Sequence, residues 1–350
     1  MPDFRDWLKA KGGKVSFETF MEAALGDPHF GYYTSAVKNV GPRGDFSTSA
    51  TIHPVLAWAI ARWLEENAPR VFGHKSWHII EVGAGTGAMA RNVLRSMPLW
   101  RSWFTHVHLV EMSPSLRAKQ RRRLRGFRCS WHDSIEQALE KCGGKALIYS
   151  NEFVDAFPCI QIVWKNGAWK EVVLELAGDV VREQLVDFGP ERLDPGQFSI
   201  FSTLANPVEG QRCELHGSYR SWLSGWAGLL KCGAILTVDY GELAGDLYER
   251  RPSGTIRAYF QHQVLQGLQV YQRFGRQDLT ADVNFTDLIN WGEAEGFQTE
   301  FYTTQRDFIK AHVSTASETV DEMLRIRQLT DETGAGGSFK VLCQSVGLEG

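Results

Sequence analysis

The sequence lacks the cysteine pairs that mark zinc sites and disulfide frameworks. Its six cysteines, at positions 129, 142, 159, 213, 232 and 343, are scattered and include no C-x-x-C pair. Such paired spacing is typical of zinc ribbons and of small secreted scaffolds. The pattern therefore predicts free thiols in a reducing compartment, with no metal and no disulfide.

Long apolar runs and a strong net charge are also missing. No run of about 18 apolar residues occurs, which argues against a membrane-spanning helix. The first six residues already carry Asp3 and Asp6, unlike a signal or transit peptide. The net charge of −3 gives no general attraction to nucleic acid. We therefore expect a cytoplasmic protein without membrane insertion, and its 43% apolar residues are enough for a full core.

The basic residues gather in one run, which allows two interpretations. Residues 117–128 carry seven lysines and arginines, at positions 117, 119, 121, 122, 123, 125 and 128. A nucleic-acid enzyme uses such a patch for phosphate contacts, whereas a solvated helix face would turn only Leu116 and Leu124 inward. No aromatic ladder for stacking bases interleaves with the charges. We favour the solvated face and do not expect nucleic acid as a partner.

The sequence does contain a short apolar run that ends in glycines. Residues 77–82 predict a buried strand, and Gly83, Gly85 and Gly87 follow with G-x-G-x-G spacing before a helical apolar pattern. Glycine lets the backbone turn sharply and leaves room for a ligand. The glycines alone do not choose between NAD and S-adenosylmethionine. Glu81 favours the latter, because a carboxylate there would repel a pyrophosphate and suits an ammonium group.

Acidic residues follow the next two predicted strands. Strand 106–110 ends at Glu111, 28 residues after Gly83, which is roughly where doubly wound sheets hold ribose hydroxyls. Strand 127–132 ends at Asp133. This carboxylate either accepts a hydrogen bond from an adenine amino group or caps the helix that follows.

A series of short motifs runs through most of the chain. They are FETFM at 17–21, DPHFGYY at 27–33, GDFST at 44–48, the glycine loop, EMSPSLR at 111–117, SNEF at 150–153 with Asp155-Ala156, DYG at 239–241, DLTADV at 278–283 and FKVL at 339–342. In this order they resemble the MidA methyltransferases, whose mitochondrial members assist assembly of respiratory complex I. The resemblance implies S-adenosylmethionine as cofactor, S-adenosylhomocysteine as product, and symmetric dimethylation of an arginine in a protein substrate.

We therefore expect the α/β fold of a class I methyltransferase, a Rossmann-like, doubly wound sheet of seven strands whose last strand is antiparallel. Residues 1–75 are expected to form a helical region that covers the cofactor. There Asp45 either closes on the methionine end or fixes a turn. Residues 76–350 are expected to form the core, with an insertion at about 157–230 that begins with a hairpin around Asn166 and Gly167.

The residues after the fourth predicted strand, 146–150, are the candidates for chemistry on the substrate. Arginine methylation needs carboxylates, because a guanidinium is permanently charged and its lone pairs are delocalised. Glu152 and Asp155 are candidates for such a clamp, although two carboxylates on one turn equally suit helix capping. Asn151 is an alternative that would orient a substrate NH through its side-chain carbonyl.

The expected function is thus that of a protein arginine N-methyltransferase. Two alternatives stay open, a small-molecule or nucleic-acid methyltransferase and an assembly factor with vestigial methyl transfer. The intact glycine loop argues against the assembly factor.

Overall fold

The computed structural model describes residues 3–36, 52–188, 194–314 and 319–348. The chain divides into two compact units, each assembled from three segments. The first unit comprises Met1–Val37, Val154–Trp222 and Gly241–Leu288, and the second comprises Lys38–Phe153, Leu223–Tyr240 and Ile289–Gly350. The boundary expected at residue 75 falls inside the second unit.

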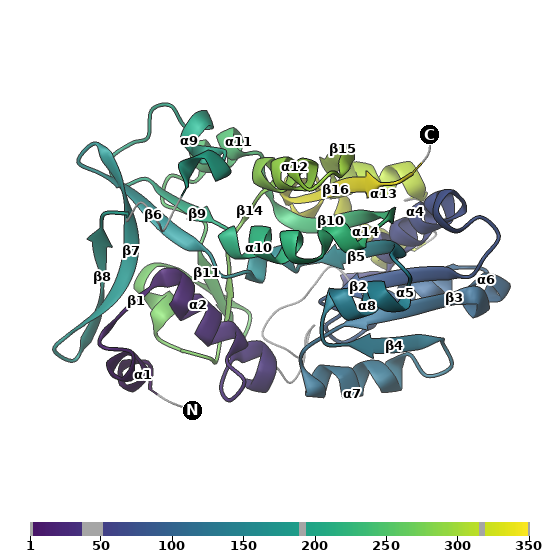
Figure 1. Ribbon diagram of the computed structural model, residues 1–350, viewed down its shortest axis with the longest axis horizontal. Helices are drawn as coiled ribbons and strands as arrows, with labels where there is room; N and C mark the ends of the chain where they lie inside the picture. The colour runs from purple at the N-terminus through teal and green to yellow at the C-terminus, as the bar shows by residue number, and fades with distance from the viewer. Residues whose placement is uncertain (1–2, 37–51, 189–193, 315–318, 349–350) are drawn as a thin grey trace. The chain divides into compact units, whose positions relative to one another are not determined.

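The second unit is built on a sheet of seven strands in the order β15-β16-β10-β5-β2-β3-β4 (Figure 1). The strands are β2 (Trp77–Val82), β3 (Thr105–Val110), β4 (Cys129–His132), β5 (Lys145–Asn151), β10 (Cys232–Glu242), β15 (Gln298–Thr304) and β16 (Phe339–Val346). The first five are parallel, and β16 is antiparallel to both of its neighbours. This order confirms the expected class I fold. The order in which the chain adds strands to the sheet changes side between β2 and β5. Doubly wound sheets bind their ligands at such a point.

Helices lie on both faces of this sheet. α4 (Val55–Phe72) contacts α5 (Ala88–Ser96), α13 (Gln305–His312) and β5, while α8 (Ile135–Lys141) contacts β2, β3 and β4. Ile79 of β2 belongs to the core around α4. His78, the preceding residue, approaches Cys142 just after α8. Because successive side chains of a strand point to opposite faces, α4 and α8 cover opposite faces.

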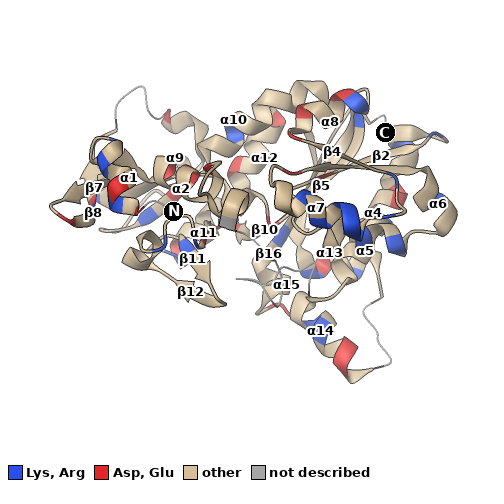
Figure 2. Ribbon diagram, turned by 90° about the horizontal axis from the view of Figure 1, so that it is seen from below, with Lys and Arg blue, Asp and Glu red and all other residues tan. Residues whose placement is uncertain are grey.

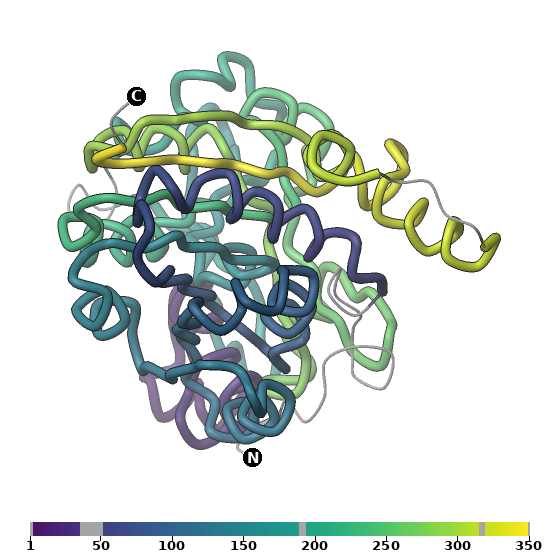
Figure 3. Tube along the Cα trace, turned by 90° about the vertical axis from the view of Figure 1, so that its right-hand side faces the viewer, coloured from purple at the N-terminus to yellow at the C-terminus, as the bar shows by residue number. Residues whose placement is uncertain are grey.

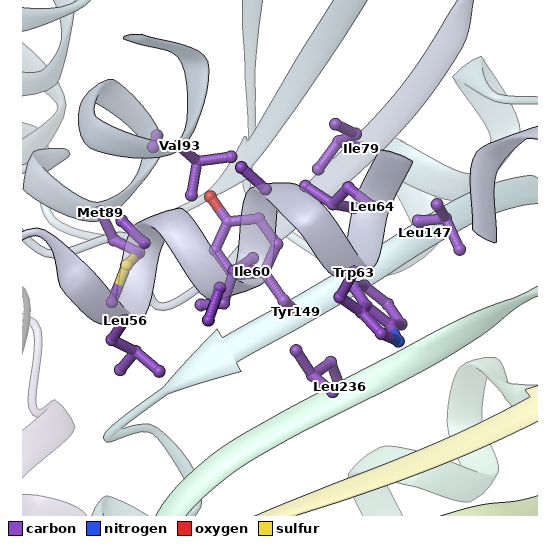
Figure 4. Packing of buried hydrophobic residues seen from close by; sticks show 14 of the residues in the cluster. Leu56, Ile60, Trp63, Leu64, Ile79, Met89, Val93, Leu147, Tyr149 and Leu236 are labelled. Carbon is purple, nitrogen blue, oxygen red and sulfur yellow. The ribbon is translucent and has the colours of Figure 1, made fainter. Parts of the chain in front are cut away.

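α4 supplies the centre of the core in this unit. Its Leu56, Ile60, Trp63 and Leu64 recur at helical spacing and are almost completely buried, against strand residues such as Leu236 (Figure 4). Burial of each side chain of this kind contributes about 1.5–3 kcal/mol to the free energy of folding. This apolar face explains why α4 is part of the second unit, although the sequence placed it in an N-terminal covering region.

The first unit contains two antiparallel sheets. The larger has the order β1-β7-β6-β9, with β8 also paired to β7, and the smaller has the order β12-β11-β13. Their strands are β1 (Lys14–Ser16), β6 (Ile160–Lys165), β7 (Ala168–Ala177), β8 (Val180–Val186), β9 (Arg212–Leu215), β11 (Arg257–Phe260), β12 (Gln263–Leu265) and β13 (Asp278–Thr280). The two-residue strand β14 (Val283–Asn284) pairs with Gly241 and Glu242, the last residues of β10, which belong to this unit.

The hairpin expected around Asn166 and Gly167 is present as β6 and β7. Both turn residues have positive φ, 53° and 78°, as a two-residue hairpin turn requires. The hairpin is part of a larger sheet than expected, because β1 pairs with β7. The N-terminal segment is therefore not purely helical.

The other helices and helical turns are shorter. In the first unit they are α1 (Phe4–Ala10), α2 (Phe17–Gly26), η1 (Tyr32–Ala36), η2 (Val154–Ala156), η3 (Pro195–Gln197), α9 (Ile200–Thr203), α11 (Ala244–Arg250) and η5 (Gly267–Tyr271). In the second they are α6 (Leu99–Phe104), α7 (Pro114–Arg123), η4 (Ala227–Leu229), α14 (Val320–Thr330) and α15 (Ala335–Ser338). The unit boundaries cut α10 (Gly217–Trp226) and α12 (Phe285–Ala294).

The C-terminal strand closes the large sheet. β16 lies beside β15 over its length, as the yellow and yellow-green traces of Figure 3 show. Among the described residues, no helix is both long enough and apolar enough to cross a membrane.

Candidate functional site

The chain turns sharply where β2 leads into α5. Gly83, Gly85 and Gly87 have φ values of 69°, 51° and 73°, in the left-handed region that favours glycine. The N–H of Gly83 donates to the carbonyl of Val110 at 3.1 Å, and Gly87 caps α5. The loop thus joins the end of β2 to the positive end of a helix dipole.

The three glycines differ in what a side chain would meet. A Cβ at Gly83 would lie 2.6 Å from the ring of Phe153, and one at Gly87 would lie 3.2 Å from Gln120. A Cβ at Gly85 would meet no described atom within 4 Å. Gly83 and Gly87 are therefore required by packing, whereas the backbone at Gly85 is open to a ligand.

Gln120 of α7 connects this loop to two neighbouring strands. Its side chain is fully buried, and its Oε1 accepts a hydrogen bond from the indole N–H of Trp131 at 2.8 Å. Because an indole nitrogen only donates, Nε2 must be the donor on the other side. It donates to the carbonyl of Gly85 at 2.7 Å and to Oε2 of Glu111 at 3.2 Å. Sequence reasoning missed Gln120, whose position inside the basic run concealed it.

Glu111 lies directly after β3, as expected for a ribose-binding acid. Its Oε1 accepts from the backbone N–H of Ser113 at 2.9 Å, and its Oε2 accepts from Gln120. Burial raises the pKa of Glu111, and both hydrogen bonds oppose that shift. Each carboxylate oxygen offers two lone pairs, so Glu111 keeps acceptor capacity in a fixed orientation.

Asp133 is exposed and forms an ion pair with Arg117 at 2.6 Å. The N-cap of α8 is Ser134, whose hydroxyl accepts from the N–H of Gln137. The capping alternative for Asp133 is therefore wrong, because the neighbouring serine fills that position. Arg117 also donates to the carbonyls of Glu111 and His132, and so connects the ends of β3 and β4.

Glu81 is buried near the end of β2. It accepts a hydrogen bond from the hydroxyl of Tyr149 at 3.0 Å and one from the backbone N–H of Ala90 in the first turn of α5. Burial raises the pKa of Glu81 to about 8, and the nearby charge of Glu111 adds to the shift. Buried hydrogen bonds of Glu81 thus connect the end of β2 to β5 and to the first turn of α5.

The end of β5 presents two acceptors. Asn151 Nδ2 donates to Oε1 of Glu152 at 3.0 Å, which leaves Asn151 Oδ1 as a buried oxygen with no partner among the described residues. Glu152 has φ 53°, unusual for a residue with a side chain. Its N–H donates to the carbonyl of Val238 at 3.0 Å. The next N–H, that of Phe153, donates to the buried carboxylate of Asp239 at 3.0 Å. Asp239, which sequence reasoning used only as part of a motif, thus holds this turn.

Asp155 belongs to the first unit, whereas Glu152 belongs to the second. Asp155 is buried, and its carbonyl accepts from the N–H of Ala281 at 3.0 Å. In the same unit the hydroxyl of Tyr33 donates to Asp278 at 2.7 Å. Burial, followed by the charges of Asp278 and Asp155, raises the pKa of Tyr33. The clamp of Glu152 and Asp155 stays a prediction, and Asp45 lies outside the described residues.

Most of the basic run lies on α7, whose ribbon in Figure 2 carries a large patch of blue, the colour of lysine and arginine. Leu116 and Leu124 are buried, as the solvated-face interpretation expected. Several of its arginines also contact the fold: the guanidinium of Arg121 lies 4.3 Å from the ring centre of Trp131, and Arg123 donates to the hydroxyl of Thr86 in the glycine loop. Part of the basic run therefore stabilises the fold.

Comparison with known proteins identifies the family of the chain. Residues 55–303 match the model of a family described as "putative S-adenosyl-L-methionine-dependent methyltransferase". A crystal structure from Burkholderia thailandensis with S-adenosyl-homocysteine bound is 25% identical, has a TM-score of 0.82, and is matched over 99% of this chain and 91% of its own. The open backbone at Gly85 and the oriented carboxylate of Glu111 fit such a nucleoside ligand.

Two curated relatives carry a more specific description. "Protein arginine methyltransferase NDUFAF7 homolog, mitochondrial" from Drosophila melanogaster is 26% identical over 313 residues, 81% of this chain and 68% of that protein. "Protein arginine methyltransferase NDUFAF7, mitochondrial" from Danio rerio is 27% identical over 320 residues, 79% of this chain and 68% of that protein.

Replacement of Gly85 by valine should weaken binding of S-adenosylmethionine by at least about 100-fold, about 2.7 kcal/mol. The branched side chain would enter the space open to the ligand and would strain a positive φ. Isothermal titration measures the loss. Gly73→Val is the matched control, because Gly73 has φ 59° and also no described atom within 4 Å of an added Cβ. Unchanged affinity in Gly85→Val, or heat with NAD instead of S-adenosylmethionine, would contradict the assignment.

Glu81→Gln should flatten the dependence of stability on pH. The pKa of Glu81 is about 8 in the folded protein against an ordinary 4.5. Between these values the folded chain keeps a proton that the unfolded chain has lost. The free energy of unfolding therefore falls as pH rises, by up to about 1.4 kcal/mol per pH unit. Urea unfolding from about pH 5 to about pH 8 should show a smaller fall for the variant than for wild type or the exposed control Glu140→Gln. Parallel curves would refute the raised pKa.

Proposed function

Because the chain belongs to this family of S-adenosyl-L-methionine-dependent methyltransferases, we propose that it methylates an arginine side chain of a protein substrate. The resemblance to the MidA methyltransferases is confirmed by the curated relatives, which cover most of the chain. Their printed names support arginine as the acceptor. Methyl transfer itself is the activity of the family.

When bound, S-adenosylmethionine supplies a methyl group already activated on a sulfonium. The chain has to hold that ligand and align the acceptor. Gly85 and the first turn of α5 would accommodate it beside β2, with Glu111 to accept hydrogen bonds from the ribose. Asp133 is the candidate for the adenine amino group. Gln120 fixes the position of Glu111 relative to the glycine loop, because its amide donates to both.

The observation that carries the choice of arginine is the pair of acceptors at the end of β5. The Oδ1 of Asn151, which has no partner among the described residues, and the carboxylate of Glu152 are adjacent in sequence and joined through the Asn151 amide. A guanidinium has five N–H donors and no acceptor, so it needs such acceptors. The turn that presents them is held by Val238 and Asp239 on β10.

Glu152→Gln should reduce kcat by roughly 30-fold to 1000-fold, about 2–4 kcal/mol, and leave the affinity for S-adenosylmethionine nearly unchanged. It removes a charged partner of the guanidinium and no contact to the cofactor. Steady-state kinetics and the melting temperature are to be measured on the same variant. Glu140→Gln, on the exposed face of α8, is the matched control. A normal rate with a lowered melting temperature would show that Glu152 only stabilises the turn.

The class of substrate is tested by mass spectrometry of cells with and without the gene. We expect methylated arginine in at least one protein to disappear in the deletion strain and to return with the wild-type gene. The gene carrying Gly85→Val should not restore it. If methyl groups from labelled S-adenosylmethionine enter small molecules or nucleic acid and no protein arginine, the proposal is refuted while methyl transfer stands.

A further inference from the structure

A row of histidines crosses three strands of the second unit. His78 Nδ1 lies 3.1 Å from His108 Nε2, and His108 Nδ1 lies 3.0 Å from His132 Nε2. The three rings come from β2, β3 and β4, on the face that α8 covers. Nothing in methyl transfer uses them. His78 precedes Gly83 by five residues, about 16 Å along a strand, so the His78 end of the row is well separated from the glycine loop, whereas His132 directly precedes Asp133.

Cys142 completes a set of metal-binding atoms beside this row. It is the C-cap of α8, and its backbone N–H donates to carbonyls of the last turn of that helix. The thiol is free and buried. The ligand atoms of His78, His108 and Cys142 all lie within 4.8 Å of one another.

We propose that His78, His108 and Cys142 bind a borderline transition-metal ion of the Zn²⁺ type. Zinc–nitrogen and zinc–sulfur bonds of about 2.0–2.3 Å place tetrahedral ligand atoms about 3.3–3.8 Å apart. The two histidine nitrogens already have nearly this separation, and the thiol has to approach by about 1 Å or less. The protein thus provides three ligands, and a fourth position is left for water.

The surroundings keep the two histidine ligands neutral. Burial lowers the pKa of His108 to about 3 and also lowers the pKa of His78, so both rings are neutral at physiological pH. His132 acts as a positioning residue, because its hydrogen bond to His108 Nδ1 directs His108 Nε2 toward the site. Binding releases the thiol proton of Cys142 to water and leaves the proton of His78 on its Nε2. His78 is partly exposed and marks the side from which an ion enters.

This site could not be predicted from the sequence, because its three ligands are far apart along the chain. They lie 30 and 34 residues apart and are brought together by parallel pairing of β2 with β3 and by the return of α8. The expectation of no metal rested only on the missing C-x-x-C pairs. The proposed ion would fasten the end of α8 to the sheet.

The test is a titration of the chelator-treated full-length protein with Co²⁺, a spectroscopic substitute for Zn²⁺. We expect one Co²⁺ per chain, with a thiolate-to-metal charge-transfer band that Zn²⁺ abolishes. Cys142→Ser should lose the band and weaken binding at least about tenfold. His78→Ala should also weaken it, and His132→Phe should do so by about tenfold while keeping the band.

Cys129→Ser is the matched control. Burial raises the pKa of both Cys129 and Cys142 to about 12, but Cys129 packs against the core around α4, on the opposite face. It should keep the band and the affinity. Circular dichroism and S-adenosylmethionine binding verify that each variant is folded. Absence of the band in wild type, or an equal band in folded Cys142→Ser, would overturn the proposal, as would a fully retained affinity in His78→Ala.

Discussion

The buried amide of Gln120 is the contact on which the geometry of the glycine loop depends. A single side chain accepts from Trp131 on β4 and donates to Gly85 and Glu111, which follow β2 and β3. Each partner is fixed by what it can donate or accept, so the amide has only one orientation. Loss of this side chain would leave several buried polar groups without partners, at about 1–3 kcal/mol each. The positions of Gly85 and Glu111 are therefore fixed by a buried residue that need not contact a ligand itself.

The parts of the fold that follow a local pattern could be predicted from the sequence. The strands β2, β3, β4 and β5 lie within a few residues of their expected positions, because short apolar runs between polar turns define them. The turn at Asn166 and Gly167 was predictable for the same reason. β1 was not, since a three-residue strand has no periodicity and exists only through its pairing with β7. The placement of α4 in the second unit likewise depends on tertiary packing.

The site shows the same division between local and long-range information. Gly85 and Glu111 were predicted because they closely follow the ends of strands, and the end of a strand is visible in the sequence. Asp133 shows the limit of that reasoning, since an acid before a helix suggests a cap until the neighbouring serine is seen to fill the position. Asp239 holds the turn at Phe153 across 86 residues of sequence. Only strand pairing between β5 and β10 brings the two together.

Electrostatics connects the stability of the second unit to its function. Glu81 and Glu111 are both buried near the loop, and each loses solvation that its hydrogen bonds only partly replace. Together with the carboxylate of Glu152 they concentrate acidic groups at one edge of the sheet. A protein selected for stability alone would avoid this arrangement, because buried like charges raise one another's pKa. The cofactor of the family carries a positive sulfonium and an ammonium group, and cations beside these acids would favour their ionised forms. The hydrogen bonds of Gln120 and Asp239 hold this edge of the sheet in a fixed geometry, so the cations of a bound cofactor would meet acids that are already in place.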